Sequence, residues 1–174
     1  MKVFFIGAGP GDPDLLTIKG QRVISKCKVC LYAGSLVPEA IIKGAPRGAM
    51  VLDTASMNLT ETHQQILDAY ERGDNVARVH SGDPSLYGAI AEQIRLLKRD
   101  NIDYEIIPGV PAYTAVAAAL GIELTIPEIS QSLILTRMSM KSTSMPESET
   151  LKNFALTGAT LAIHLGIRLS LIHI

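Results

Sequence analysis

The sequence predicts an α/β fold that is built around a mostly parallel sheet. Short apolar runs alternate along the chain with longer segments of helical periodicity, and this alternation is typical of βαβ units. Loops rich in glycine, proline or serine follow four of the expected strands. Because parallel strands end at the same edge of their sheet, we expect these loops to form one binding site there.

The expected strands are short runs rich in β-branched and aromatic residues, at 3–6, 29–32, 50–52, 76–80 and 104–107. Longer patterns predict helices at 15–25, 60–71, 85–98 and 112–120. Leu16, Val23 and Ile24 share one side of the first helix, and the last helix is rich in alanine. Thr60 and Ser85 are the expected N-caps of the middle two helices, since a hydroxyl oxygen there accepts a hydrogen bond from a free backbone N–H.

The regular alternation of expected strands and helices ends after Pro127. We expect strands at 132–136 and 161–164, separated by a polar segment, 138–149, that is typical of a linker or loop. The sequence therefore predicts an N-terminal α/β domain at residues 1–126 and the beginning of a second, incomplete α/β domain at residues 127–168. Residues 169–174 match one translation frame of a transposon end used to prepare sequencing libraries. We therefore expect a non-native tail there and a gene that continues after about Arg168.

Composition and charge exclude several classes of function. Apolar residues make up 47% of the 174 residues, and 16 Lys and Arg face 17 Asp and Glu. This balance gives no support for a nucleic-acid surface. No apolar stretch reaches the roughly 18 residues that a membrane span needs, and the N-terminus resembles a first strand rather than a signal peptide. We expect a cytoplasmic protein without a membrane partner.

The cysteines and histidines do not form a metal-binding pattern. Cys27 and Cys30 are spaced as in redox and zinc motifs, but no second such pair follows them. Their place between a helix and a strand favours two small buried apolar residues. The four histidines show no ligand spacing either, so we expect no metal.

The first loop, residues 7–13, argues against a dinucleotide site. Gly7 and Gly9 fit the dinucleotide pattern, but Asp12 stands where the third glycine is needed. Pro10 removes a backbone N–H that a pyrophosphate would use, and Pro13 delays the start of the helix. The loop therefore suits a cationic or neutral ligand better than a phosphate.

The loops at 81–85 and 108–112 indicate the same kind of ligand. The first contains Asp83 and no lysine or arginine. A simple strand–helix turn does not need the Asp83 carboxylate, so we expect this carboxylate to serve the ligand. The second offers backbone carbonyls and small side chains, a shape that suits a flat apolar ring.

Five motifs together resemble the S-adenosylmethionine-dependent tetrapyrrole (precorrin) methyltransferases. They are GAGPGDPDLLT (7–17), YAGSLVPE (32–39), SGDPSLYG (81–88), PGVPAYTAVAAALGIELT (108–125) and ILTR (134–137). The second and fourth are most similar to the branch that methylates C11 of precorrin-4 or cobalt-precorrin-4 in cobalamin biosynthesis. The resemblance implies a tetrapyrrole methylase-like fold, S-adenosyl-L-methionine as cofactor, a tetrapyrrole as substrate, and a homodimer when full length.

The resemblance also implies a set of cofactor-binding residues. They are Pro10, Ser81, Gly82, Asp83, Leu86, Tyr87, Pro111, Ala112 and Leu165. No catalytic side chain is identified, because methyl transfer from a sulfonium needs alignment rather than a nucleophile. Arg137 and Lys141 are candidates for binding the carboxylates of the substrate.

Three alternatives remain open from the sequence. A nicotinamide-dependent oxidoreductase needs an acidic residue at the end of the second strand, where Tyr32 to Ser35 stand instead. A sister methyltransferase could act on another tetrapyrrole position, on uroporphyrinogen or on a macromolecule. The chain could also be an inactive fragment of such an enzyme, with an exposed apolar face where the rest of a second domain is missing.

Overall fold

A computed structural model of the chain describes residues 1–138 and 144–166. The chain forms two compact units, Met1–Ala115 and Val116–Ile174, which are considered separately. The domain division that we expect after residue 126 stays a prediction. The expected non-native tail at 169–174 lies outside the described residues, as does Lys141.

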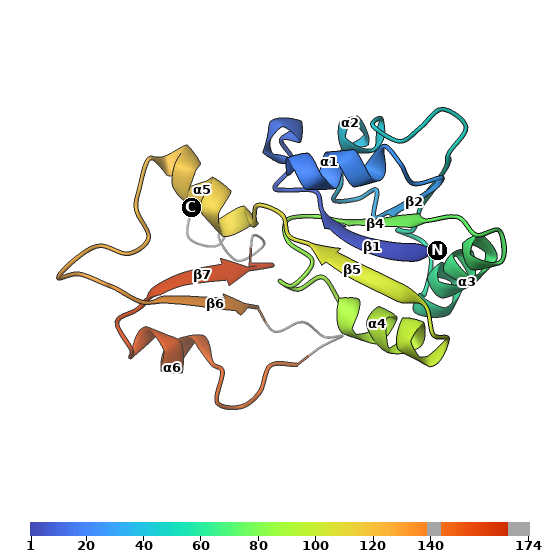
Figure 1. Cartoon of the computed structure of the whole chain (residues 1–174). Helices are drawn as coiled ribbons and strands as arrows, with labels where there is room; N and C mark the ends of the chain where they lie inside the picture. The colour runs from blue at the N-terminus through green and yellow to red at the C-terminus, as the bar shows by residue number, and fades with distance from the viewer. Residues whose placement is uncertain (139–143, 167–174) are drawn as a thin grey trace. The chain divides into compact units, whose positions relative to one another are not determined.

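The first unit contains a five-stranded sheet in the order β3-β2-β4-β1-β5, in which every pair of neighbours is parallel. The strands are β1 (Lys2–Gly7), β2 (Val29–Tyr32), β3 (Met50–Asp53), β4 (Val76–His80) and β5 (Asp103–Ile107). The order places β4, β1 and β5 side by side, so the loops that follow these three strands leave the same edge of the sheet together (Figure 1). This confirms the predicted α/β class and parallel sheet.

Helices cover both faces of this sheet, as Figure 1 shows. Buried residues of α1 (Ile18–Ile24) and α2 (Glu39–Ile42) pack with Ile6 and Val79 on one face. Buried residues of α3 (Leu59–Glu71) and α4 (Ile90–Arg99) pack with Val3 and Phe5 on the other. Because both faces are buried, the central strands are almost continuously apolar, as the sequence pattern of a parallel sheet requires.

The second unit contains a parallel pair of strands, β6 (Leu133–Arg137) and β7 (Thr160–His164). The helix α6 (Leu151–Ala155) precedes β7, and α5 (Ala112–Leu120) spans the boundary between the units. The Thr160 hydroxyl donates to the Leu124 carbonyl at 2.8 Å, and the Thr160 amide donates to the Ser132 carbonyl at 3.0 Å. These bonds join the start of β7 to the segment before β6.

Several expected helix boundaries are wrong. The first helix begins only at Ile18, because Thr17 is its N-cap and a short 3₁₀ turn, η1 (Pro13–Leu15), comes before it. The helix expected at 85–98 is α4, and it begins at Ile90 rather than Ser85. Ser85 instead donates from both its amide and its hydroxyl to Asp83. The short helices α2 and α6 have too few residues to produce a clear periodic pattern.

The N-cap of α3 is Asn58 and not Thr60. The Asn58 side chain accepts from the Glu61 amide at 3.0 Å, and the Glu61 carboxylate accepts from the Asn58 amide at 2.8 Å. This reciprocal pair is a capping box. It satisfies two backbone donors that would otherwise have no partner within the helix.

We therefore expect Asn58→Ala to lower the free energy of unfolding by about 1 kcal/mol, because the first turn of α3 loses its cap. Thr60→Ala is the matched control and should change it by less than about 0.5 kcal/mol. Urea unfolding followed by circular dichroism measures both values. Equal effects from the two variants would contradict the assignment of the cap.

Candidate functional site

The loops after β1, β4 and β5 meet in a main-chain contact at the carboxyl edge of the sheet. The Gly9 amide donates to the Gly82 carbonyl at 3.2 Å, and the Gly82 amide donates to the Gly9 carbonyl at 2.7 Å. The Ala8 amide also donates to the His80 carbonyl at 2.7 Å. The first two loops are therefore held together by backbone hydrogen bonds that continue the pairing of their strands.

Three glycines allow this contact, two because no side chain could fit between the loops and one because of its backbone conformation. A Cβ on Gly7 would lie 2.5 Å from the Gly109 Cα and 2.6 Å from the Gly82 oxygen. A Cβ on Gly109 would collide with the same Gly82 oxygen and lie 2.7 Å from the Gly7 Cα. Gly82 itself has a φ of +59°, a region that favours glycine. We call this contact of Gly7, Gly82 and Gly109 the glycine junction.

The Asp83 carboxylate fixes the third loop to the second. One of its oxygens accepts from the Gly109 amide at 3.0 Å, and the other accepts from the Ser85 amide at 2.8 Å and from the Ser85 hydroxyl. Burial raises the pKa of the Asp83 carboxyl, but these hydrogen bonds outweigh it and hold that pKa below its ordinary value. The carboxylate is therefore ionised at neutral pH and is held by three donors of its own chain.

A second carboxylate organises the neighbouring loop after β2. One Asp53 oxygen accepts from the Gly34 and Ala55 amides, both at 2.8 Å, and these bonds lower the pKa of Asp53. A Cβ on Gly34 would collide with the same carboxylate. The loop at 33–35 thus approaches the end of β3 closely, and a side chain at Gly34 would have to displace the Asp53 carboxylate.

The structure brings together most of the residues predicted to bind the cofactor. Pro10 lies next to Gly9 in the first loop, and Ser81 and Asp83 flank Gly82 in the second. Gly82 faces the start of α5, since a Cβ there would lie 3.8 Å from the Pro111 Cα and 3.9 Å from the Ala112 nitrogen.

The remaining three predicted residues are Leu86 and Tyr87 in the first unit and Leu165 in the second. Leu86 is half-buried, and Tyr87 is 47% exposed with a φ of 55°. Leu165 follows β7 in the second unit, where it is 62% exposed. Its proximity to the junction stays a prediction, as do the individual cofactor contacts of all nine residues.

Two residues of β4, Arg78 and His80, are polar and buried, and Arg78 was not singled out from the sequence. Arg78 is 8% exposed and donates to the Thr54 hydroxyl at 2.9 Å and to the Gln93 side-chain oxygen at 3.1 Å. His80 is equally buried, and its Nε2 atom has no hydrogen-bond partner among the described residues. Burial, helped by the charge of Arg78, lowers the pKa of His80 to about 3. A charged residue inside an otherwise apolar strand was the available signal for Arg78.

Cys27 and Cys30 are buried and free, which confirms their predicted role as small apolar residues. Burial raises the pKa of Cys27 to about 11 and that of Cys30 to about 12, so both remain thiols at neutral pH. The described residues contain no group of three or more His, Cys, Asp or Glu arranged to hold a metal ion. Within the same residues, no helix has the length and apolarity to cross a membrane.

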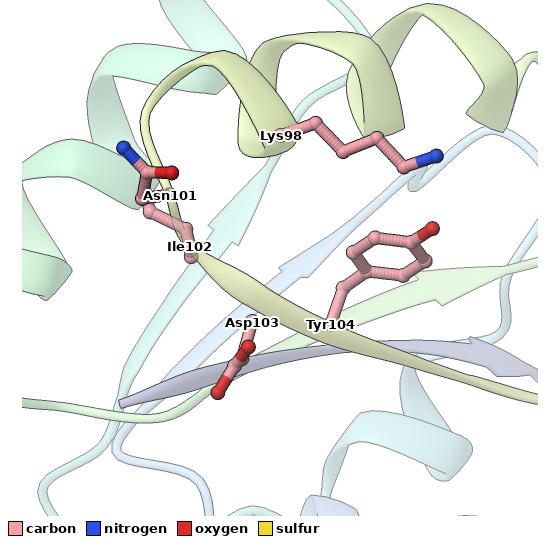
Figure 2. Close-up of a pocket in the computed structure, with 5 residues that line it drawn as sticks. All are labelled: Lys98, Asn101, Ile102, Asp103 and Tyr104. Carbon is pink, nitrogen blue, oxygen red and sulfur yellow. The ribbon is translucent and has the colours of Figure 1, made fainter.

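A cavity of about 320 Å³ lies away from the junction, at the amino end of β5 (Figure 2). It is lined by Lys98, Asn101, Ile102, Asp103 and Tyr104. In Figure 2, Lys98 comes from α4 and Tyr104 from β5. Ligands of parallel α/β sheets bind at the carboxyl ends of strands, so this cavity is not the candidate site.

The comparisons with known proteins agree with this architecture. Residues 2–172 match the family of Tetrapyrrole (Corrin/Porphyrin) Methylases, and the chain therefore belongs to that family. A precorrin-4 C(11)-methyltransferase from Pseudomonas aeruginosa is 59% identical over 167 residues, which are 96% of this chain and 66% of that protein. The chain spans about two thirds of the length of the curated relatives it matches.

Two solved structures carry the same fold. A cobalt precorrin-4 methyltransferase is 48% identical, with a TM-score of 0.92 over 97% of this chain and 70% of that one. A uroporphyrin-III C-methyltransferase from Thermus thermophilus, solved in complex with S-adenosylhomocysteine, is 25% identical. Its TM-score is 0.74 over 95% of this chain and 66% of that one.

We expect Gly109→Ala to lower the free energy of unfolding by about 3 kcal/mol, because the added methyl collides with backbone atoms that cannot rotate away. Gly44→Ala is the control, since the nearest atoms to a Cβ there lie at ordinary contact distances of 3.6 and 3.9 Å. Urea unfolding midpoints compare the two variants. An effect of Gly109→Ala no larger than that of the control would refute the close packing of the junction.

Proposed function

We propose that the whole protein transfers a methyl group from S-adenosyl-L-methionine to C11 of precorrin-4 or cobalt-precorrin-4. One geometric observation carries the proposal: the glycine junction joins three loops of the carboxyl edge into a single main-chain surface. Membership of the tetrapyrrole methylase family and the high identity to precorrin-4 C(11)-methyltransferases support this choice of reaction.

The residues of the three loops fit a cofactor that carries a positive sulfonium. The segments 7–13, 81–85 and 108–112 contain no lysine or arginine, whereas Asp12 and Asp83 contribute carboxylates. A Cβ on Gly11 would meet nothing within 4 Å, so the first loop leaves open space beside Pro10. These features favour a cationic or neutral ligand over the pyrophosphate of a dinucleotide.

The roles of the chain in this reaction are binding and orientation. The bound cofactor supplies an activated methyl group whose transfer removes the positive charge of the sulfonium. Pro10, Gly82 and Pro111 would shape the surface against which the cofactor lies, and Asp83 would keep two of the loops at a fixed separation. The useful geometry places the reacting carbon about 3–3.5 Å from the methyl group, in line with its bond to sulfur.

No acid–base group is required for the transfer itself, and the described residues offer only weak candidates. With a pKa of about 3, His80 is a neutral imidazole at neutral pH and a poor proton acceptor. Arg137 donates to the carbonyls of Met138 and Ser144, at 3.1 and 3.3 Å, so part of its hydrogen-bonding capacity is used within the chain. Arg137 nevertheless remains our candidate for a carboxylate of the substrate.

The whole protein is further proposed to be a cytoplasmic homodimer. The balanced charge, 16 basic against 17 acidic residues, supports neither a nucleic-acid nor a membrane partner. Sedimentation of the protein expressed from the complete gene measures the oligomeric state directly.

The test of the reaction is a methyl-transfer assay with the protein expressed from the complete gene and with the 174-residue chain. Precorrin-4 and cobalt-precorrin-4 are compared with uroporphyrinogen III as substrates. Mass spectrometry detects the methylated product, and NMR locates the added methyl group. We expect methylation at C11 of the first two compounds. Methylation of uroporphyrinogen alone would instead indicate the sister activity, and no transfer by the complete protein would refute the proposal.

We expect Asp83→Ala to weaken the binding of S-adenosylhomocysteine at least tenfold, because the loop that contains Gly109 loses its anchor. Asp103→Ala is the control, since Asp103 is exposed at the opposite end of β5. Isothermal titration calorimetry gives both dissociation constants, and circular dichroism checks that each variant is folded. Unchanged affinity in a folded Asp83→Ala protein would contradict this role.

A further inference from the structure

A buried cation in the first unit lines a cavity and has no carboxylate partner among the residues that the structure describes. Arg78 is 8% exposed, and its recorded hydrogen bonds go to two neutral groups, the Thr54 hydroxyl and the Gln93 side-chain oxygen. Within residues 1–138 and 144–166, no acidic side chain lies within ion-pairing distance of it. A buried charge is ordinarily paired, because its removal from water is costly.

The neutral partners of Arg78 are themselves fixed in place. The Thr54 hydroxyl donates its proton to the Tyr32 carbonyl at 3.0 Å, so its lone pairs face the guanidinium. The Gln93 amide donates to the Ala89 carbonyl at 3.3 Å, which turns its oxygen toward Arg78. These bonds hold the guanidinium in one orientation and use two of its five N–H donors.

The cavity beside Arg78 has a volume of about 190 Å³, large enough for a small oxyanion. We call it the Arg78 pocket. Its lining comes from the end of β3, from β4, and from the first turns of α3 and α4, and consists of Thr54, Met57, Asn58, Leu59, Thr62, Arg78, Ala89, Glu92 and Gln93. All of these residues belong to the first unit.

The start of a helix adds to the positive potential that Arg78 gives the pocket. Helix α4 begins there after Ala89, which supplies no side-chain cap to the first N–H groups of the helix. The partial positive charge of a helix N-terminus adds to that of the guanidinium. Burial lowers the pKa of Arg78 to about 10, so the side chain stays charged at neutral pH.

One acidic residue of the lining opposes this charge. Glu92 lies in the first turn of α4, and its carboxylate is 3.9 Å from the Arg95 guanidinium. Its side chain is 66% exposed, so water screens its charge, unlike that of the buried Arg78. Glu92 therefore reduces the positive potential of the pocket without neutralising it.

We propose that the Arg78 pocket binds one small oxyanion, a carboxylate or a phosphate, through the Arg78 guanidinium. A planar guanidinium with unused donors matches either anion, and the anion supplies the charge partner that the described part of the chain does not. The inference rests on the first unit alone and is independent of the proposed methyl transfer. A carboxylate would come from an organic ligand, and a phosphate from solution.

The test measures the thermal unfolding midpoint of the 174-residue chain in sodium acetate, sodium phosphate and sodium chloride at equal ionic strength and pH. We expect acetate or phosphate to raise Tm by about 3–5 °C over chloride at ten times its dissociation constant. A response to acetate alone assigns the pocket to carboxylates, and a response to phosphate alone assigns it to free phosphate. No response to either anion would overturn the proposal.

Two pairs of variants locate the effect. Arg78→Gln should abolish the shift, whereas Arg47→Gln, which removes an exposed arginine, should keep it. Glu92→Gln should tighten anion binding about threefold, because a repulsive charge is removed, and Glu39→Gln should not. If Arg78→Gln fails to fold, the proposal is tested by the Glu92→Gln variant, because Glu92 is exposed. Anion binding no tighter in Glu92→Gln than in Glu39→Gln would overturn the proposal. An equal shift in a folded Arg78→Gln protein would do the same.

Discussion

The close approach of three loops at the carboxyl edge of the sheet is the constraint on which the candidate site depends. The order β4-β1-β5 places the ends of these strands side by side, but only residues without a Cβ allow their loops to touch. Gly7 and Gly109 meet that requirement with backbone atoms on each side. The close approach of the loops is therefore a property of the main chain, to which the Asp83 carboxylate adds one side-chain anchor.

Carboxylates near this edge hold loops rather than stand free for chemistry. Asp83 joins the loop after β4 to the loop after β5, and Asp53 joins the loop after β2 to the end of β3. Both accept backbone hydrogen bonds, which stabilise the ionised form and so keep these anchors intact at neutral pH. This arrangement suits a reaction in which alignment supplies most of the catalysis and no side chain has to change its protonation state.

The sequence was sufficient to locate the strands of the parallel sheet, but not to predict their order or the details of the edge. Apolar runs and glycine loops located all five strands and predicted that their loops would meet. The start of α4 was misplaced because Ser85 resembles a cap, whereas its hydroxyl and amide both bind Asp83. The pairing of Asp83 with Gly109 joins residues that are 26 positions apart, and local patterns carry no information about such a contact.

The partners of the charged residue Arg78 could not be predicted from local sequence patterns either. An arginine within a strand signals something unusual, but its partners, Thr54 and Gln93, lie on other elements and are both uncharged. Complementary charge is the usual guide to partners of arginine, and here it would have been misleading. Gln93 lies on α4 and Thr54 follows β3, so only the packing of both elements around β4 identifies these partners.

A main-chain junction of this kind separates the packing of the loops from the side chains that the loops expose. During evolution, the exposed side chains can change while the packing stays the same. Gly7 and Gly109 tolerate no replacement without displacing the backbone, whereas an exposed residue of a neighbouring loop, such as Leu36, has room to vary. Substitutions among the exposed residues can alter what the loops touch while the junction itself stays unchanged. A lineage built on this scaffold can therefore acquire new contacts step by step without rebuilding the main-chain junction at the edge of its sheet.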